Sequence, residues 1–270
     1  MDGVRDLIAA PNVPANINFG VDFANSSWYY RNTGTASNPT FEFVQRNFLQ
    51  DQMLDLGENA APAFFDYDND GDFDMFIGTM LSEVLSFQST IKVFENVGTI
   101  SSPSFVLEND DLFGFSQSGF INIKPRFKDV DGDNIVDLAF TGTNISTGVS
   151  ALYYLKGEPG IFEFDLSIIL TAFNQLGINE NVSIVDIDGD SFNDLLIGRS
   201  TGRLEYHRNI GSDLTTEYTL EDPSFYGLDF SPFRQNIAAE VTDFDGDGAL
   251  DLITGDARGA LTVYEEFMAK

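Results

Sequence analysis

Five aspartates occupy alternate positions in the stretch FFDYDNDGDFDMFIG: Asp66, Asp68, Asp70, Asp72 and Asp74. Ionised carboxylates this close repel one another, and here they lead directly into an apolar run. Oxygen ligands in this number suit a hard cation, and Ca²⁺ takes about six to eight oxygens at roughly 2.3–2.6 Å. The stretch therefore predicts either a solvated acidic turn or a loop that binds a cation.

The same pattern occurs four times in full. Each copy has aspartate at positions 1, 3, 5 and 9 and continues into an apolar run that ends in glycine. The copies, here called the Asp loops, are DYDNDGDFD (66–74), DVDGDNIVD (129–137), DIDGDSFND (186–194) and DFDGDGALD (243–251). A partial copy at the N-terminus aligns Asp2 and Asp6 with positions 5 and 9. The ninth-position aspartates are 68, 63, 57 and 57 residues apart, which predicts a repeat architecture.

Each Asp loop supplies one expected set of metal ligands. The set contains the aspartates at positions 1, 3, 5 and 9 and the main-chain carbonyl at position 7. The expected ligands are Asp66, Asp68, Asp70, Asp72 and Asp74; Asp129, Asp131, Asp133, Ile135 and Asp137; Asp186, Asp188, Asp190, Phe192 and Asp194; and Asp243, Asp245, Asp247, Ala249 and Asp251. About four Ca²⁺ sites follow from these sets.

Position 6 of each loop requires a left-handed backbone, which glycine adopts most readily. Gly71, Asn134 and Gly248 suit this position, whereas Ser191 suits it less well and predicts a weaker third site.

An EF-hand does not fit these loops, because it requires a bidentate glutamate at position 12 and flanking helices. Position 12 is Ile77, Phe140, Ile197 or Thr254, and each lies in a predicted strand. The other alternative is a set of solvated acidic β-turns. That interpretation leaves several like charges unbalanced at the start of a buried strand in every repeat.

The segments around the loops are short, rich in Phe, Val, Ile, Leu and Tyr, and bounded by Gly, Asn, Asp and Pro, which is typical of strands. The continuous apolar runs predict strands buried on both faces, as in sheets stacked around an axis. We therefore expect an all-β fold, a single β-propeller domain over residues 1–270 built of four-stranded antiparallel blades. The repeat units span about 1–58 (partial), 59–121, 122–179, 180–235 and 236–270 (partial), which is about 4.5 repeats and roughly 18 strands.

The pattern D-x-D-x-D-G-x-x-D-L-x-x-G, followed by a strand end such as KVFENVG (92–98) or EYHRNIG (205–211), resembles the FG-GAP/VCBS repeat. Such repeats form the propellers of integrin α subunits and of many bacterial secreted or surface proteins. The resemblance spans essentially the whole chain and implies Ca²⁺ in loops between the first two strands of several blades. Family propellers commonly have seven blades. The chain is therefore expected to be either a fragment of a larger propeller, which is favoured, or a small ring that closes with incomplete blades. An open fragment exposes sheet edges, which favours self-association.

The composition restricts the partners. The formal charge is −29, from 43 acidic and 14 basic residues, so nucleic acid and anionic membrane surfaces are poor partners. The chain has no cysteine, which excludes disulfides and thiolate metal sites. No apolar run is long enough to insert in a membrane, and no signal peptide is visible. The acidic loops suit millimolar extracellular Ca²⁺, and we expect a secreted or cell-surface location.

Three functions remain open on the sequence; one of them, a purely architectural segment of a large secreted protein, cannot be separated by sequence from the first function below. The first is a non-enzymatic, calcium-stabilised propeller for adhesion or for recognition of an unknown protein or glycan. The second is a propeller-type polysaccharide lyase or hydrolase, which needs a positioned base or a pair of acids. The one histidine, His207, lies in EYHRN and is expected to be a strand-surface residue, so the first function is favoured.

Overall fold

The computed structural model describes residues 4–9, 27–48, 56, 59–80, 89–211, 216–228 and 235–268. The chain divides into two compact units, Met1–Leu56 and Gly57–Lys270, and each is described here by itself. Asp2, expected to belong to the partial N-terminal loop, lies outside the described residues.

The first unit contains one three-stranded antiparallel sheet. Its strands are β1 (Leu7–Ala9), β2 (Trp28–Asn32) and β3 (Phe41–Gln45), in that order across the sheet. Asp6 directly precedes β1, and its Oδ1 accepts a hydrogen bond of 2.8 Å from the main-chain N–H of Asn32.

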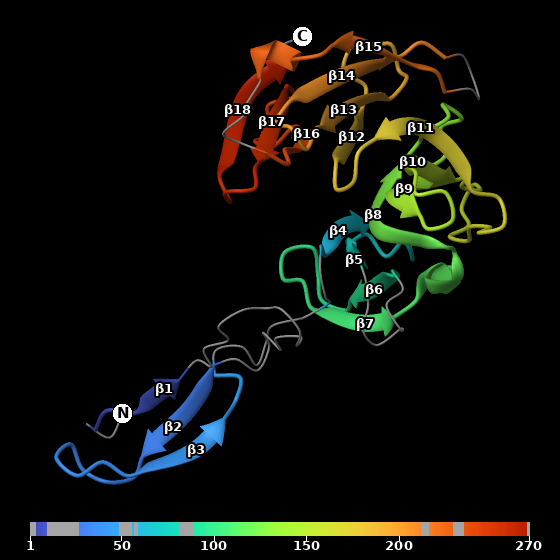
Figure 1. Cartoon of the computed structure of the whole chain (residues 1–270). Coiled ribbons are helices and arrows are strands. Elements are labelled where there is room, and N and C mark those ends of the chain that lie inside the picture. The colour runs from blue at the N-terminus through green and yellow to red at the C-terminus, as the bar shows by residue number, and fades with distance from the viewer. Residues whose placement is uncertain are drawn as a thin grey trace. The chain divides into compact units, whose positions relative to one another are not determined.

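The second unit contains three four-stranded sheets and one three-stranded sheet (Figure 1). The first consists of β4 (Ala61–Phe65), β5 (Asp74–Gly78), β6 (Ile91–Asn96) and β7 (Phe105–Asn109). The second consists of β8 (Phe120–Lys128), β9 (Asp137–Asn144), β10 (Ser150–Leu155) and β11 (Leu170–Leu176). The third consists of β12 (Asn181–Val185), β13 (Asp194–Gly198), β14 (Leu204–Asn209) and β15 (Tyr218–Asp222). The last consists of β16 (Ala238–Thr242), β17 (Leu250–Gly255) and β18 (Leu261–Met268).

Each sheet is an antiparallel meander in which successive strands are neighbours. Short 3₁₀ turns, η2 (Leu112–Gln117) and η3 (Phe225–Gly227), follow the fourth strands of the first and third sheets of the second unit. The prediction of an all-β fold with four-stranded antiparallel sheets is confirmed. The described residues form 18 strands, which agrees with the number expected from the repeats.

The middle strands of the sheets are buried on both faces. Every residue of β13 is buried, and so is every residue of β10. In contrast, all five residues of β7 are exposed. The continuous apolar runs after the Asp loops therefore mark the interior strands, as the sequence predicts.

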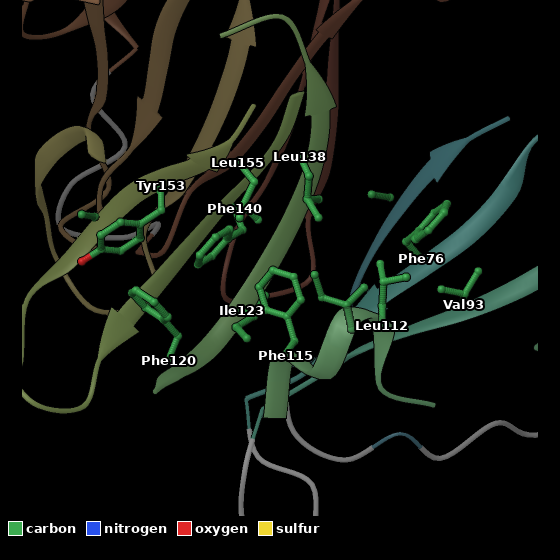
Figure 2. Close-up of a cluster of buried hydrophobic side chains, with 13 residues drawn as sticks. Phe76, Val93, Leu112, Phe115, Phe120, Ile123, Leu138, Phe140, Tyr153 and Leu155 are labelled. Carbon is green, nitrogen blue, oxygen red and sulfur yellow. The ribbon is translucent and has the colours of Figure 1, made fainter. Parts of the chain in front are cut away.

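Three buried hydrophobic clusters lie between successive sheets. The first contains Phe76 and Val93 of one sheet and Phe140 and Tyr153 of the next, and Phe115 of η2 lies between these two pairs (Figure 2). The second cluster joins the sheet of β8–β11 to that of β12–β15, and the third joins β12–β15 to β16–β18. Each sheet that has two neighbours thus contributes one face to each of two clusters.

Two glycines allow the sheets to approach closely. A Cβ atom built on Gly198 at the end of β13 would lie 1.9 Å from the carbonyl oxygen of Ile237, which precedes β16. Gly78 at the end of β5 holds the equivalent place, where a Cβ atom would lie 2.1 Å from the carbonyl oxygen of Ile123. The glycine that ends these apolar runs is therefore required by the backbone of the following sheet.

Within the part of the chain that the structure describes, no helix has the length and apolar character needed to cross a bilayer.

Candidate functional site

The four Asp loops connect the first and second strands of the four sheets in the second unit. All four fold through the same two hydrogen bonds. The first-position carboxylate accepts from the main-chain N–H at position 6, at 3.1, 2.8, 2.9 and 3.0 Å along the chain. The fifth-position carboxylate accepts from the N–H at position 7, at 3.0, 2.9, 2.9 and 2.7 Å. The aspartate side chains of each loop thus hold the turn by accepting hydrogen bonds from its own backbone N–H groups.

The ninth-position aspartate ties each loop to the sheet. Oδ2 of Asp137 accepts from the N–H of Val130 at 2.9 Å, and Oδ1 accepts from the N–H of Gly157 on the third-strand side at 2.9 Å. Asp194 makes the same two bonds with Ile187 and Asn209, at 3.0 and 2.8 Å. Both oxygens are therefore occupied by backbone donors, a structural role that the sequence did not indicate.

Two positions in each loop adopt the left-handed conformation. Position 6 has φ of 97° at Gly71, 64° at Asn134, 76° at Ser191 and 90° at Gly248. The expectation that this position requires a left-handed backbone is confirmed, and Ser191 adopts it despite its side chain. Position 4 is also left-handed, with Asn or Gly in every loop, a second backbone requirement that was not predicted from the sequence.

The structure brings three carboxylates together in each loop, with oxygens all within 4.8 Å of one another. In the first loop these belong to positions 1, 3 and 5, namely Asp66, Asp68 and Asp70. In the other three loops they belong to positions 1, 3 and 9: Asp129, Asp131 and Asp137; Asp186, Asp188 and Asp194; Asp243, Asp245 and Asp251. The other aspartates expected to bind through their carboxylates, Asp74, Asp133, Asp190 and Asp247, lie outside these groups.

Burial makes the ionised form of these carboxylates costly. The side chain of Asp131 is fully buried, and its Oδ1 has no hydrogen-bond partner among the described residues. Burial raises the pKa of Asp137 to about 6, against the opposing effect of its hydrogen bonds from Gly157 and Val130. Burial also raises the pKa of Asp194. A cation at such a site would favour the charged form of the carboxylates.

In the first three loops the ninth-position aspartate accepts one hydrogen bond from a residue at or just after the end of the third strand, and the residue that precedes this donor differs among these loops. In the second loop it is Lys156, whose ammonium pairs with Asp131. In the third it is Arg208, whose Nε lies 2.5 Å from Asp188 Oδ2. In the first it is Glu95, whose pKa is raised by burial and by nearby carboxylates, foremost Glu108. Two loops thus carry a cationic side chain of the protein, and one carries an additional carboxylate.

His207 is not a strand-surface residue, which corrects the expectation from the sequence. It is only 4 % exposed in β14 and packs edge-on against Phe173, with ring centroids 4.9 Å apart. Its Nε2 lies 3.0 Å from Oε2 of Glu205, which also pairs with Arg199. Burial lowers the pKa of His207. The histidine is buried because its strand is interior, whereas the sequence alone places it beside charged neighbours.

A second set of repeat-related residues was not predicted. Asn59, Asn122, Asn179 and Asn236 precede or begin the first strand of each sheet, and their spacings of 63, 57 and 57 match those of the Asp loops. All four have positive φ, between 52° and 66°. A search for identical residues at the loop spacing would have found them.

A scan against models of known protein families finds no match for this chain, and a search of curated proteins finds none either.

Proposed function

We propose that this chain is a non-enzymatic, calcium-binding β-propeller repeat domain of the FG-GAP/VCBS kind. In this proposal the stacked sheets are propeller blades, and the Asp loops bind about four Ca²⁺ ions. The observation that carries it is the recurrence of one loop four times, each with three carboxylates converging at the start of an interior strand.

The donors present fit calcium. They are carboxylate oxygens, which are hard ligands, and at Asp131 one oxygen is buried with no hydrogen-bond partner among the described residues. A bound Ca²⁺ would supply positive charge that offsets the repulsion among these carboxylates. The chain's own residues hold the loop shape: the first- and fifth-position aspartates bind backbone N–H groups, and the ninth-position aspartate anchors the turn to the sheet.

The role we propose is adhesion or recognition of a protein or glycan, with rigid blades presenting loops on the faces of the domain. A secreted or cell-surface location suits this role, because weak acidic sites fill only at millimolar extracellular calcium. The resemblance of the repeats to those of integrin α subunits and bacterial surface proteins supports the same location.

Thermal unfolding with millimolar CaCl₂, with MgCl₂ and with excess EDTA tests the proposal. A ligand that binds only the folded state raises stability by RT ln(1 + [L]/Kd). We expect a rise of several degrees with CaCl₂ that EDTA reverses and MgCl₂ does not reproduce.

Calorimetric titration of single variants tests the assignment of the loops. Asp66→Asn, Asp129→Asn, Asp186→Asn and Asp243→Asn each remove one first-position carboxylate, and each should remove about one calcium from the stoichiometry. Asp110→Asn is the matched control, because Asp110 is an exposed aspartate outside the loops. Equal stoichiometry in all five variants, or no thermal shift with CaCl₂, would contradict the proposal and favour solvated acidic turns.

A further inference from the structure

Three of the four repeat-related asparagines, Asn59, Asn122 and Asn179, meet through their side chains. Nδ2 of Asn122 donates to Oδ1 of Asn179 at 2.7 Å, and Nδ2 of Asn59 donates to the same oxygen at 3.3 Å. Asn59 and Asn122 also lie 3.5 Å apart through Nδ2 and Oδ1. Residues up to 120 positions apart in sequence therefore gather at the end of the first strands that is opposite to the Asp loops.

An open pocket of about 400 Å³ lies at these asparagines. Its polar lining consists of Asn59, Lys124, Arg126, Asn179, Asn181 and Asn236. None of the described residues that line it is acidic, although the chain has 43 acidic and only 14 basic residues. The pocket therefore concentrates two of the few cations of the protein in one place.

The two cations have incomplete pairing. Lys124 and Arg126 stand two residues apart on β8 and thus point to the same side of the strand. Lys124 Nζ donates to the main-chain oxygens of Asn179 and Glu180, at 3.1 and 3.3 Å. Burial and the neighbouring Arg126 lower the pKa of Lys124 to about 8, so the site disfavours its own positive charge.

The guanidinium of Arg126 has one donor that no described residue binds. Its Nη1 donates to the carbonyl oxygen of Pro125 at 2.9 Å. Its Nε is buried and has no hydrogen-bond partner among the described residues, and its Nη2 lies 4.0 Å from Glu240, which is half exposed. The Nε and Nη2 edge is the one that binds a carboxylate through two parallel hydrogen bonds.

We propose that this pocket binds a hydroxylated carboxylate, the chemistry shared by uronic acids and small hydroxy acids. The carboxylate is held by the edge of Arg126 and by the ammonium of Lys124. The asparagine side chains, which both donate and accept hydrogen bonds, bind the hydroxyl groups. The pocket volume is in the range of small-ligand sites, about 300–1,000 Å³.

The inference goes beyond the proposed calcium binding and does not depend on it, because no Asp-loop residue lines the pocket. It rests on three observations together: the two neighbouring cations, the Nε of Arg126 that no described residue binds, and the cluster of asparagine side chains. A bound anion would offset the repulsion between the positive charges of Lys124 and Arg126, which is the physical reason to expect an anion in this pocket.

Titration calorimetry with sodium glucuronate, sodium lactate, sodium acetate, glucose and inorganic phosphate tests this site at physiological ionic strength. Each titration is made in CaCl₂ and again in EDTA, with circular dichroism to check the fold, so a failure of calcium binding is distinguished from a failure of this pocket. We expect glucuronate or lactate to bind more tightly than acetate, and glucose not to bind.

Lys124→Gln and Arg126→Gln should each weaken glucuronate or lactate binding by about tenfold or more, because each removes a charge-assisted hydrogen bond. The matched controls are Lys92→Gln, a lysine that also donates to a main-chain oxygen, and Arg258→Gln, an exposed arginine. Both control variants should bind glucuronate or lactate as tightly as the unaltered protein does. Absence of binding by both hydroxylated carboxylates in both buffers, tighter binding of phosphate or glucose, or unchanged binding in Lys124→Gln and Arg126→Gln would overturn the proposal.

Discussion

The ammonium of Lys156 pairs with the carboxylate of Asp131, whose side chain is fully buried in the second Asp loop. Asp131 is the third-position aspartate, one of the residues expected to bind calcium. The protein therefore supplies its own cation at this loop, and any metal ion there must compete with it.

Replacing Lys156 with glutamine tests whether the lysine ammonium and a calcium ion compete for the carboxylate of Asp131. Without calcium, Lys156→Gln leaves a buried carboxylate unpaired, which costs about 1–3 kcal/mol of unfolding free energy. The lower end is expected, because the lysine side chain is 45 % exposed. With CaCl₂ the loss should shrink, and the calcium affinity of this loop should rise. Urea unfolding in EDTA and in CaCl₂ measures both effects, with Lys92→Gln as the control; an identical calcium response in the two variants would contradict the competition.

Ser191→Gly should stabilise the third loop. Ser191 has φ of 76°, a left-handed conformation that costs a residue with a side chain roughly 1–2 kcal/mol. Glycine removes that cost but adds freedom to the unfolded chain, about 0.5–1 kcal/mol. The net gain should be up to about 1 kcal/mol by urea unfolding. The reciprocal change, Gly248→Ser at the same position of the fourth loop, should destabilise by a similar amount. A loss of stability in Ser191→Gly, or a gain in Gly248→Ser, would refute the explanation.

Gly198→Ala should destabilise the contact between two sheets. The added methyl group would lie 1.9 Å from the carbonyl oxygen of Ile237, so the backbones must separate at a cost of about 1–3 kcal/mol. Gly142→Ala is the control, because the nearest atom to its methyl group would be a ring carbon of Phe140 at 3.4 Å. Thermal unfolding of the two variants compares a close backbone approach with an ordinary contact. Similar losses in both would indicate that glycine is needed for another reason.

Stability should depend on pH through Lys124. Its pKa in the folded state is about 8, below the ordinary lysine value of 10.5. Between these values the unfolded state binds more protons, so stability rises with pH. The groups that set this pKa are Arg126, which lowers it, and Glu180, which raises it. Relative to Lys124→Gln, the unaltered protein should gain about 2 kcal/mol between pH 7.5 and pH 10. A constant difference between the two proteins across this range would rule out the shift.

The sequence predicted the features that rest on local pattern. The run DMFIG predicts an interior strand because all four residues after Asp74 are apolar or small, and β5 occupies that run. The loop turn was predicted because glycine or asparagine at position 6 indicates a left-handed backbone there. The four-stranded grouping followed from the strand signals between successive loops.

Other features depend on tertiary contacts and could not be predicted in the same way. Lys156 reaches Asp131 because the third strand returns beside the Asp loop, and no local pattern records that contact. The pocket around Lys124 forms from four separate repeats, so a single asparagine such as Asn179 gives no signal by itself. The burial of His207 follows from packing against Phe173 of the preceding sheet.

The hydrophobic clusters have a consequence for how such a chain can change in evolution. Each cluster is formed half by one sheet and half by the next, so every internal unit presents two complementary faces. A duplicated unit would bring both faces with it and create one further interface of the same kind. Gain or loss of whole repeats by unequal recombination can then preserve the interior, whereas a change of similar size within one repeat would leave two interfaces mismatched.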